Sequence, residues 1–169
     1  MYKGKNSMNN RESYLRFISL LRQAPQALSV IRGSAAYPDL QGEVRFYQLQ
    51  SGVLVVAEVM GLPVSEKPCG DRIFAFHIHD GSECSGNAQD PFADSGMHYN
   101  PQDCLHPYHA GDMPPLFGND GTAFSAFVTN RFSVQEVVGK TVIIHDKPDD
   151  FTTQPSGNAG TKIACGKIL

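Results

Sequence analysis

The histidines of this chain are unevenly distributed, and their spacing is the feature that could support chemistry. All six lie between residues 77 and 145, and five of them lie between residues 77 and 109. The set is His77, His79, His98, His106, His109 and His145. An unpartnered buried imidazole is costly, and exposed histidines have no reason to cluster. Neutral imidazoles that gather in this way are typical ligands of a transition-metal ion, so the sequence favours a metal-binding protein.

Four of these histidines are predicted to form one metal site at the ends of two apolar strands. His77 and His79 are two residues apart in an apolar segment, so in a strand they point to the same face. His145 ends a second apolar segment, and His98 lies in a loop that can fold over the first three. Four imidazoles suit Cu(II), which prefers tetragonal nitrogen ligation. We therefore predict a copper site on His77, His79, His98 and His145.

A second group of ligands lies within one short stretch of loop. His106, His109 and Asp112 fall within seven residues, and His98 adds a third nitrogen to their two nitrogens and one oxygen. This donor set suits a closed, tetrahedral, structural zinc site. His98 would then hold both metals, one through each ring nitrogen. The alternative is a set of hydrogen-bonded histidines without metal, but the sequence offers no comparable set of carboxylates as partners.

The elements that must position these ligands are predicted to be strands. Sixteen glycines and eleven prolines indicate many turns, and an apolar period of two begins near residue 27. Strands are predicted over residues 27–33, 42–50, 53–60, 72–79, 122–129, 141–145 and 161–165. Residues 80–117 and 146–160 are predicted as two long loops, which in compact domains tend to be functional. Before the strands, residues 11–23 have helical period, so residues 1–28 are interpreted as an N-terminal extension with a short helix and residues 29–169 as the domain.

The metal-ligand motifs resemble those of the copper/zinc superoxide dismutase family, from about Val30 to Leu169. The matching motifs, in family order, are Phe76-His-Ile-His79, Gly96-Met-His-Tyr-Asn-Pro101, His109-Ala-Gly-Asp112, and the segments 139–150 and 157–166. The short interval between His79 and Cys84 is similar to the bacterial branch of the family. The resemblance implies an all-β fold: a flattened, eight-stranded Greek-key β-barrel, related to immunoglobulin-like sandwiches, with two long functional loops.

The resemblance also implies an activity and roles for individual residues. The family disproportionates superoxide to O2 and hydrogen peroxide by Cu(II)/Cu(I) cycling, with a structural zinc. His98 would leave reduced copper and deliver a proton, and Asp149 would join the copper ligand His77 to the zinc ligand His106. Lys162 stands where the family usually has an arginine that attracts superoxide, which predicts retained but slower turnover. The alternative function is a copper- and zinc-binding protein of the same fold with little turnover.

The chain has four cysteines, and the resemblance pairs two of them. Cys84 and Cys165 match the family disulfide that ties the ligand loop to the last strand. Cys69 and Cys104 match no family position, and either form a second bridge that braces the zinc loop or remain two separate thiols. Connectivity cannot be deduced from the sequence, so both alternatives stay open.

Composition restricts the partners of this protein. The net charge of −3 argues against a nucleic-acid surface, and no apolar run is long enough to span a bilayer. No secretory signal is evident, so we expect a cytoplasmic protein, or a periplasmic or secreted one if a signal has been removed. The expected assembly is a monomer or a homodimer.

Overall fold

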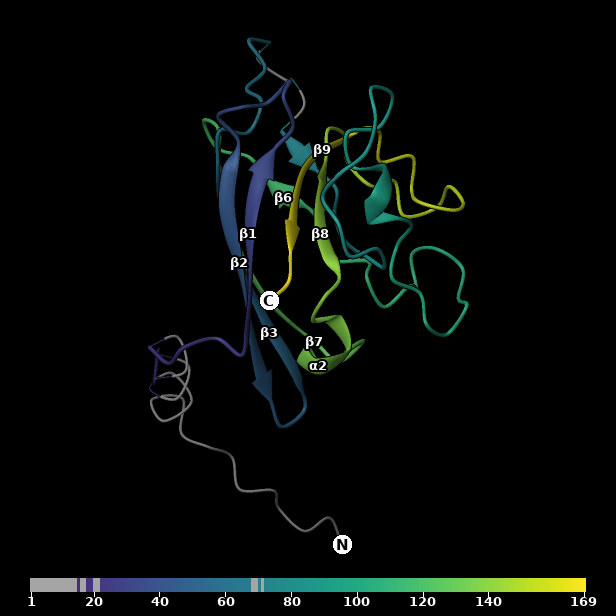
Figure 1. Cartoon of the computed structure of the whole chain (residues 1–169). Coiled ribbons are helices and arrows are strands. Elements are labelled where there is room, and N and C mark those ends of the chain that lie inside the picture. The colour runs from purple at the N-terminus through teal and green to yellow at the C-terminus, as the bar shows by residue number, and fades with distance from the viewer. Residues whose placement is uncertain (1–14, 16–17, 20–21, 68–69, 71) are drawn as a thin grey trace, which may run out of the picture.

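The computed structural model (Figure 1) describes residues 15, 18–19, 22–67, 70 and 72–169. Most of the predicted helix over residues 11–23 lies outside the described residues, as does Cys69. The N-terminal helix therefore stays a prediction, and the choice between a second disulfide and two separate thiols stays open.

The described residues form an all-β fold, as predicted, built mainly on one curled antiparallel sheet. Seven strands form this sheet in the order β5-β8-β9-β1-β2-β3-β7, and β4 pairs with β6 separately. The strands are β1 (Ala27–Gly33), β2 (Gln41–Leu49), β3 (Gly52–Met60), β4 (Ile73–Phe74), β5 (Phe76–His79), β6 (Leu116–Phe117), β7 (Thr122–Thr129), β8 (Thr141–His145) and β9 (Lys162–Lys167). Two short helices complete the described elements, the 3-10 helix η1 (Ala93–Ser95) and α2 (Val134–Val137).

Alternation along the central strands places the core on one face of the curled sheet. Val53, Val55, Ala57 and Val59 of β3 all belong to the main buried cluster, as the period of two requires. The strands that carry the metal ligands, β5 and β8, are buried along their whole length, and residues of the long loop after β5 contact both strands, with Tyr99 bonded to Ile78 and Phe92 packed with Ile143. Their apolar residues therefore form a rigid base for the histidines between them.

One predicted strand is interrupted in the structure. Residues 72–79 were expected to form a single strand, but the segment divides into β4 and β5, which belong to different sheets. The division occurs at Ala75, whose N–H donates to Lys147 O at 2.8 Å and whose C=O accepts from His145 N–H at 2.9 Å. Ala75 therefore pairs with His145 at the end of β8 and with Lys147 just beyond it, and the chain changes neighbours there.

The other strand predictions differ from the structure mainly at their ends. The ranges 27–33, 122–129 and 141–145 are confirmed, while β9 extends to Lys167 instead of ending at residue 165. The sequence reasoning missed β6, η1 and α2. No helix among the described residues is long and apolar enough to cross a bilayer.

Two long connections gather on one side of the sheet (Figure 1). The first joins β5 to β6, and the second joins β8 to β9. These are the two predicted loops, and they lie beside the strands that carry the histidines.

Candidate metal centre

The first group of histidines is positioned by the pairing of β5 with β8. His77 pairs with Ile143 and His79 with Thr141, so the two imidazoles lie on one face of neighbouring strands. His145 comes at the end of β8, one residue beyond the pair formed by Phe76 and Ile144. The sheet register therefore brings three of the four predicted copper ligands together without help from a loop.

The fourth member of this group arrives on the long loop after β5. His98 forms an isolated bridge with His79, and the next residue, Tyr99, donates its N–H to Ile78 O at 2.8 Å. Gly111 accepts from Ile78 N–H at 2.9 Å, and a Cβ at Gly111 would clash with the carbonyl oxygen of Ile78. The loop thus pairs with the free edge of β5, and a glycine is needed where the backbones approach so closely.

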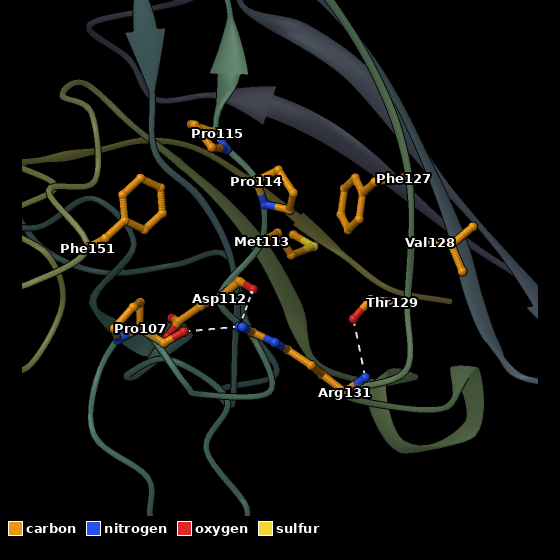
Figure 2. Close-up of a pocket in the computed structure, with 10 residues that line it drawn as sticks. All are labelled: Pro107, Asp112, Met113, Pro114, Pro115, Phe127, Val128, Thr129, Arg131 and Phe151. Atoms are coloured by element: carbon orange, nitrogen blue, oxygen red, sulfur yellow. Dashed lines mark hydrogen bonds between the residues drawn. The ribbon is translucent and has the colours of Figure 1, made fainter.

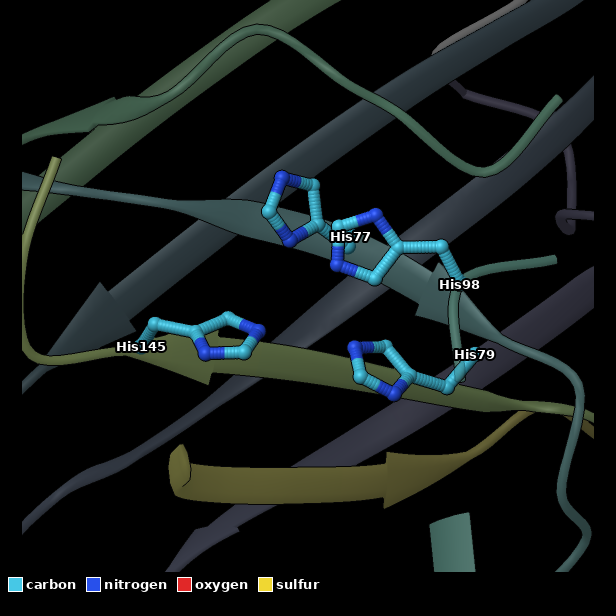
Figure 3. Close-up of side chains that lie close together, drawn as sticks. All are labelled: His77, His79, His98 and His145. Atoms are coloured by element: carbon cyan, nitrogen blue, oxygen red, sulfur yellow. The ribbon is translucent and has the colours of Figure 1, made fainter. Parts of the chain in front are cut away.

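The four imidazoles lie close together (Figure 3), and hydrogen bonds set which nitrogen of each ring faces the centre of the group. His79 Nδ1–H donates to Gly96 O at 2.9 Å, and His77 Nε2–H donates to Asp149 Oδ2 at 2.8 Å. His145 Nδ1 lies 3.4 Å from Gly160 O. The opposite nitrogens are buried and make no hydrogen bond to any described residue; they are His77 Nδ1, His79 Nε2, His98 Nε2 and His145 Nε2.

These unpartnered nitrogens are the observation that tests the fit of a metal. Each group is buried, and one ligand atom from each of the four residues lies within 4.8 Å of the others. Burial lowers the pKa of His77 to about 4 and that of His145 to about 3, so both rings are neutral at pH 7. Four converging, buried nitrogens without hydrogen-bond partners would be costly unless a cation took their lone pairs. The group therefore fits a transition metal.

The second group lies in the loop between β5 and β6, around the carboxylate of Asp112. His98 Nδ1 lies 2.7 Å from Asp112 Oδ1, while the Nδ1 atoms of His106 and His109 lie 3.1 and 3.4 Å from Asp112 Oδ2. Ligand atoms of these four residues also lie within 4.8 Å of one another. Three nitrogens and one carboxylate oxygen match the donor set predicted for zinc, and His98 belongs to both groups.

Electrostatics favour the charged form of Asp112. Burial alone would raise the pKa of Asp112, but the hydrogen bond to His98 and the neighbouring imidazoles lower it below its ordinary value. An ionised carboxylate at the centre of three imidazole nitrogens attracts a divalent cation. The second group therefore fits zinc on its charge as well as on its donor atoms.

Asp149 connects the two groups. Its Oδ2 accepts from His77 Nε2–H at 2.8 Å and its Oδ1 accepts from His106 Nε2–H at 2.9 Å. Burial opposes ionisation, but these hydrogen bonds and the Phe151 N–H lower the pKa of Asp149 to about 2. A carboxylate in this place fixes the tautomer of both rings, so that their Nδ1 atoms face the two metal groups.

Gly157 makes the Asp149 bridge sterically possible. A Cβ at this position would overlap the Asp149 carboxylate and would lie 2.7 Å from His106 Nε2. Gly157 also has a φ of +68°, which favours glycine. The loop between β8 and β9 can therefore pass directly over the bridging carboxylate.

Arg131 is a residue of this centre that sequence reasoning missed. Its guanidinium Nη1 donates to the carbonyl oxygens of Pro107 at 3.0 Å, Asp112 at 3.1 Å and His109 at 3.3 Å. Figure 2 shows the side chain crossing from the end of β7 to the zinc-group loop, along the edge of a cavity of about 440 Å³. Nothing in the local sequence indicates this contact, because Arg131 is distant from the ligands along the chain.

Lys162 begins β9 and lies close to the copper group. Its ammonium is 2.9 Å from Asp90 Oδ2 and donates to Phe92 O and Gly96 O at 3.0 and 3.3 Å. Burial is the main cause that lowers the pKa of His145, and the charge of Lys162 contributes to the same shift. Lys162 thus lies beside the copper group, as the sequence predicted. Its ion pair with Asp90 was not predicted from the sequence.

The predicted disulfide between Cys84 and Cys165 is confirmed, with Cα atoms 5.6 Å apart. It joins the loop after β5 to β9, next to Phe92 and Ile143 in a small buried cluster. Cys104 forms no disulfide with any residue that the structure describes.

The fold and the two donor groups together define a class: an all-β protein with two adjacent metal groups that share one histidine. A family profile described as copper/zinc superoxide dismutase matches residues 40–168. Superoxide dismutase [Cu-Zn] 2 of Aquifex aeolicus is 33% identical over 142 residues, covering 75% of this chain and 78% of the relative. Superoxide dismutase [Cu-Zn] A of Xenopus laevis is 30% identical over 159 residues, covering 85% of this chain and 96% of the relative.

A solved structure supports the fold independently. The Cu/Zn superoxide dismutase of Brucella abortus matches with a TM-score of 0.71 at 21% identity, covering 85% of this chain and all of that chain. The chain belongs to the copper/zinc superoxide dismutase family.

Proposed function

We propose that the protein is a copper/zinc superoxide dismutase, which converts two superoxide anions and two protons to O2 and hydrogen peroxide. The observation that carries this proposal is the pair of donor groups that share His98, with four buried, unpartnered nitrogens converging in the copper group. Copper would bind His77, His79, His98 and His145, and zinc would bind His98, His106, His109 and Asp112.

The chemistry divides between the metals and the residues of the chain. Copper, when bound, supplies a one-electron couple that zinc lacks, so that one superoxide is oxidised and a second is reduced. His98 is oriented by Asp112 at Nδ1, and its Nε2 faces the copper group, where it can hold and release a proton for the peroxide product. Asp149 keeps His77 and His106 in the required tautomers.

Lys162 supplies the positive charge that attracts the anionic substrate. The ammonium keeps the charge of the arginine that the family usually has here, but not its planar fork of five N–H donors. We expect Lys162→Arg to increase the catalytic rate. An unchanged or lower rate in this variant, with copper and zinc contents equal to those of the original protein, would contradict this role.

The test of the proposed function is a superoxide-dismutation assay with metal quantitation on the same reconstituted sample. We expect stoichiometric copper and zinc, and activity that disappears in a His145→Ala control. A fully metal-loaded protein without activity would contradict the proposal and favour the alternative, a copper- and zinc-binding protein with little turnover.

The same proposal includes the finer architecture and the setting of the protein. We propose that the sheets close into the flattened, eight-stranded Greek-key barrel of the family, and that the chain is a monomer or a homodimer. The disulfide between Cys84 and Cys165 favours a periplasmic or secreted location over the cytoplasm. An experimentally determined structure, light scattering and cell fractionation test these three points in turn.

A further inference from the structure

The ammonium group of Lys162 has its hydrogen-bonding capacity filled by the protein. A lysine head carries three N–H donors. Three acceptors surround this one: Asp90 Oδ2 at 2.9 Å, Phe92 O at 3.0 Å and Gly96 O at 3.3 Å. The Lys162 side chain is only 15% exposed. An anion that approaches the ammonium must therefore displace one of these three acceptors.

Asp90 is the acceptor most readily displaced, and it carries a full negative charge. The two backbone carbonyls are fixed by the loop, whereas the Asp90 side chain is 38% exposed to solvent. Its other oxygen, Oδ1, accepts the Phe92 N–H at 3.0 Å, and the Asp90 N–H donates to Asn87 Oδ1 at 3.1 Å. The turn thus presents one carboxylate oxygen to Lys162.

This ion pair adjoins the copper group directly. Gly96 O accepts from Lys162 and also from His79 Nδ1–H, the hydrogen bond that turns His79 Nε2 toward the other ligands. The charge of Lys162 also contributes to the electrostatic environment of His145. Removing or displacing Asp90 therefore changes the charge next to the copper group, where a small anion would bind.

We propose that Asp90 is an internal competitor for Lys162 and so sets the affinity of this site for small anions, of which superoxide is one. Asp90 is a positioning residue that acts through Lys162, and its carboxylate must give way before the ammonium can bind an anion. The identity of the anion as substrate rests on the proposed function; the competition itself does not. An arginine with five N–H donors could satisfy the same acceptors and keep donors for the anion, which is a structural reason for the effect expected of Lys162→Arg.

The direct test measures azide binding to the copper- and zinc-loaded protein by the change in Cu(II) absorption. Asp90→Asn removes the charge and keeps the size of the side chain. An ion pair with one partner exposed to solvent is worth a factor of about two to five, so the dissociation constant for azide should fall by that factor. The kcat/KM for superoxide should rise by a similar factor, and its decrease with added salt should become steeper.

Asp94→Asn is the matched control. Asp94 lies on the same loop and loses the same charge, but its carboxylate accepts from Ser85 Oγ–H at 2.6 Å and does not pair with Lys162. We expect an effect on azide affinity less than half that of Asp90→Asn. Equal effects of the two variants would overturn the proposal, because they would reflect only the net charge of the loop.

A double-mutant cycle with Lys162→Gln isolates the contact. Asp90→Asn should tighten azide binding in the original protein and have no effect when Lys162 is already Gln. Weaker azide binding in Asp90→Asn would overturn the proposal, since Asp90 would then support Lys162 instead of competing with it. Thermal unfolding of each variant shows that the fold is retained. Azide binding needs no turnover, so a protein that binds azide as expected but does not dismutate superoxide contradicts the proposed function alone.

Discussion

The two metal groups of this protein are built in different ways. The copper group takes three of its four ligands from β5 and β8, whose pairing places the imidazoles on one face of the sheet. The zinc group takes all its ligands from the loop between β5 and β6. One group is therefore positioned by the register of a buried sheet, and the other by a segment with little regular structure.

The connections around the two groups differ as well. The part of the loop near the copper group is tied to β9 by the disulfide between Cys84 and Cys165. The part that carries the zinc ligands is held by polar contacts, including those of Arg131 and a reciprocal pair in which Gln154 bonds the backbone N–H and C=O of His106. The zinc group is held by polar contacts that a single substitution can remove, so we expect such substitutions to disturb it more than they disturb the copper group.

The largest expected effect comes from removing one ligand of each group. His145→Ala should abolish dismutation and copper binding while zinc remains bound, because His145 belongs only to the copper group. His109→Ala should lose zinc and retain copper. Metal quantitation after dialysis distinguishes the two; loss of both metals in both variants would show that the groups are not separable.

The second-largest effect is expected from removing the disulfide between Cys84 and Cys165, which lies near the copper group. Replacing Cys84 and Cys165 together by Ser removes a cross-link between residues 81 positions apart, which should lower the free energy of unfolding by about 3–5 kcal/mol. Denaturant unfolding of the metal-loaded protein measures this change. We expect copper to be lost at lower denaturant concentration than in the original protein, and a variant with unchanged stability would contradict the assignment of the disulfide as the main tie of this loop.

The carboxylate bridge gives the third effect. Asp149→Asn cannot accept from both His77 and His106, so each ring loses part of its orientation. Such partners contribute about 10- to 100-fold to metal affinity. We expect a larger loss of zinc affinity than of copper affinity, because His77 is still fixed by β5 whereas His106 lies in a loop. Competition with chelators measures the dissociation constants for zinc and copper. A larger loss of copper affinity would contradict the expectation that the zinc group is the more easily disturbed.

The smallest effect is expected at Arg131. Arg131→Gln removes donors to the carbonyl oxygens of Pro107, His109 and Asp112 but touches no ligand atom, so zinc should be released about 10-fold more readily while copper affinity is unchanged. Arg32→Gln is the matched control, because Arg32 makes only peripheral contacts at 3.4 and 3.5 Å. Equal zinc release in the two variants would contradict a role of Arg131 in holding the zinc-binding loop.

The sequence indicated the donor set because the ligand signals are local. His77 and His79 share a face in any strand, and His106, His109 and Asp112 are close along the chain whatever the fold. Strands such as 122–129 and 141–145 were also predictable from alternation and apolar runs. These features depend on neighbours within a few residues, which the sequence displays directly.

The tertiary structure alone decided the contacts between distant segments. The division of residues 72–79 at Ala75 depends on Lys147 and His145, and the role of Arg131 depends on where the zinc loop passes. The pairing of Asp90 with Lys162 joins residues far apart in sequence that meet because the loop after β5 crosses the start of β9. Residue types and spacing in a single sequence identify which residues can bind a metal. The distant residues that orient or neutralise these ligands and charges come into contact with them only in the folded chain.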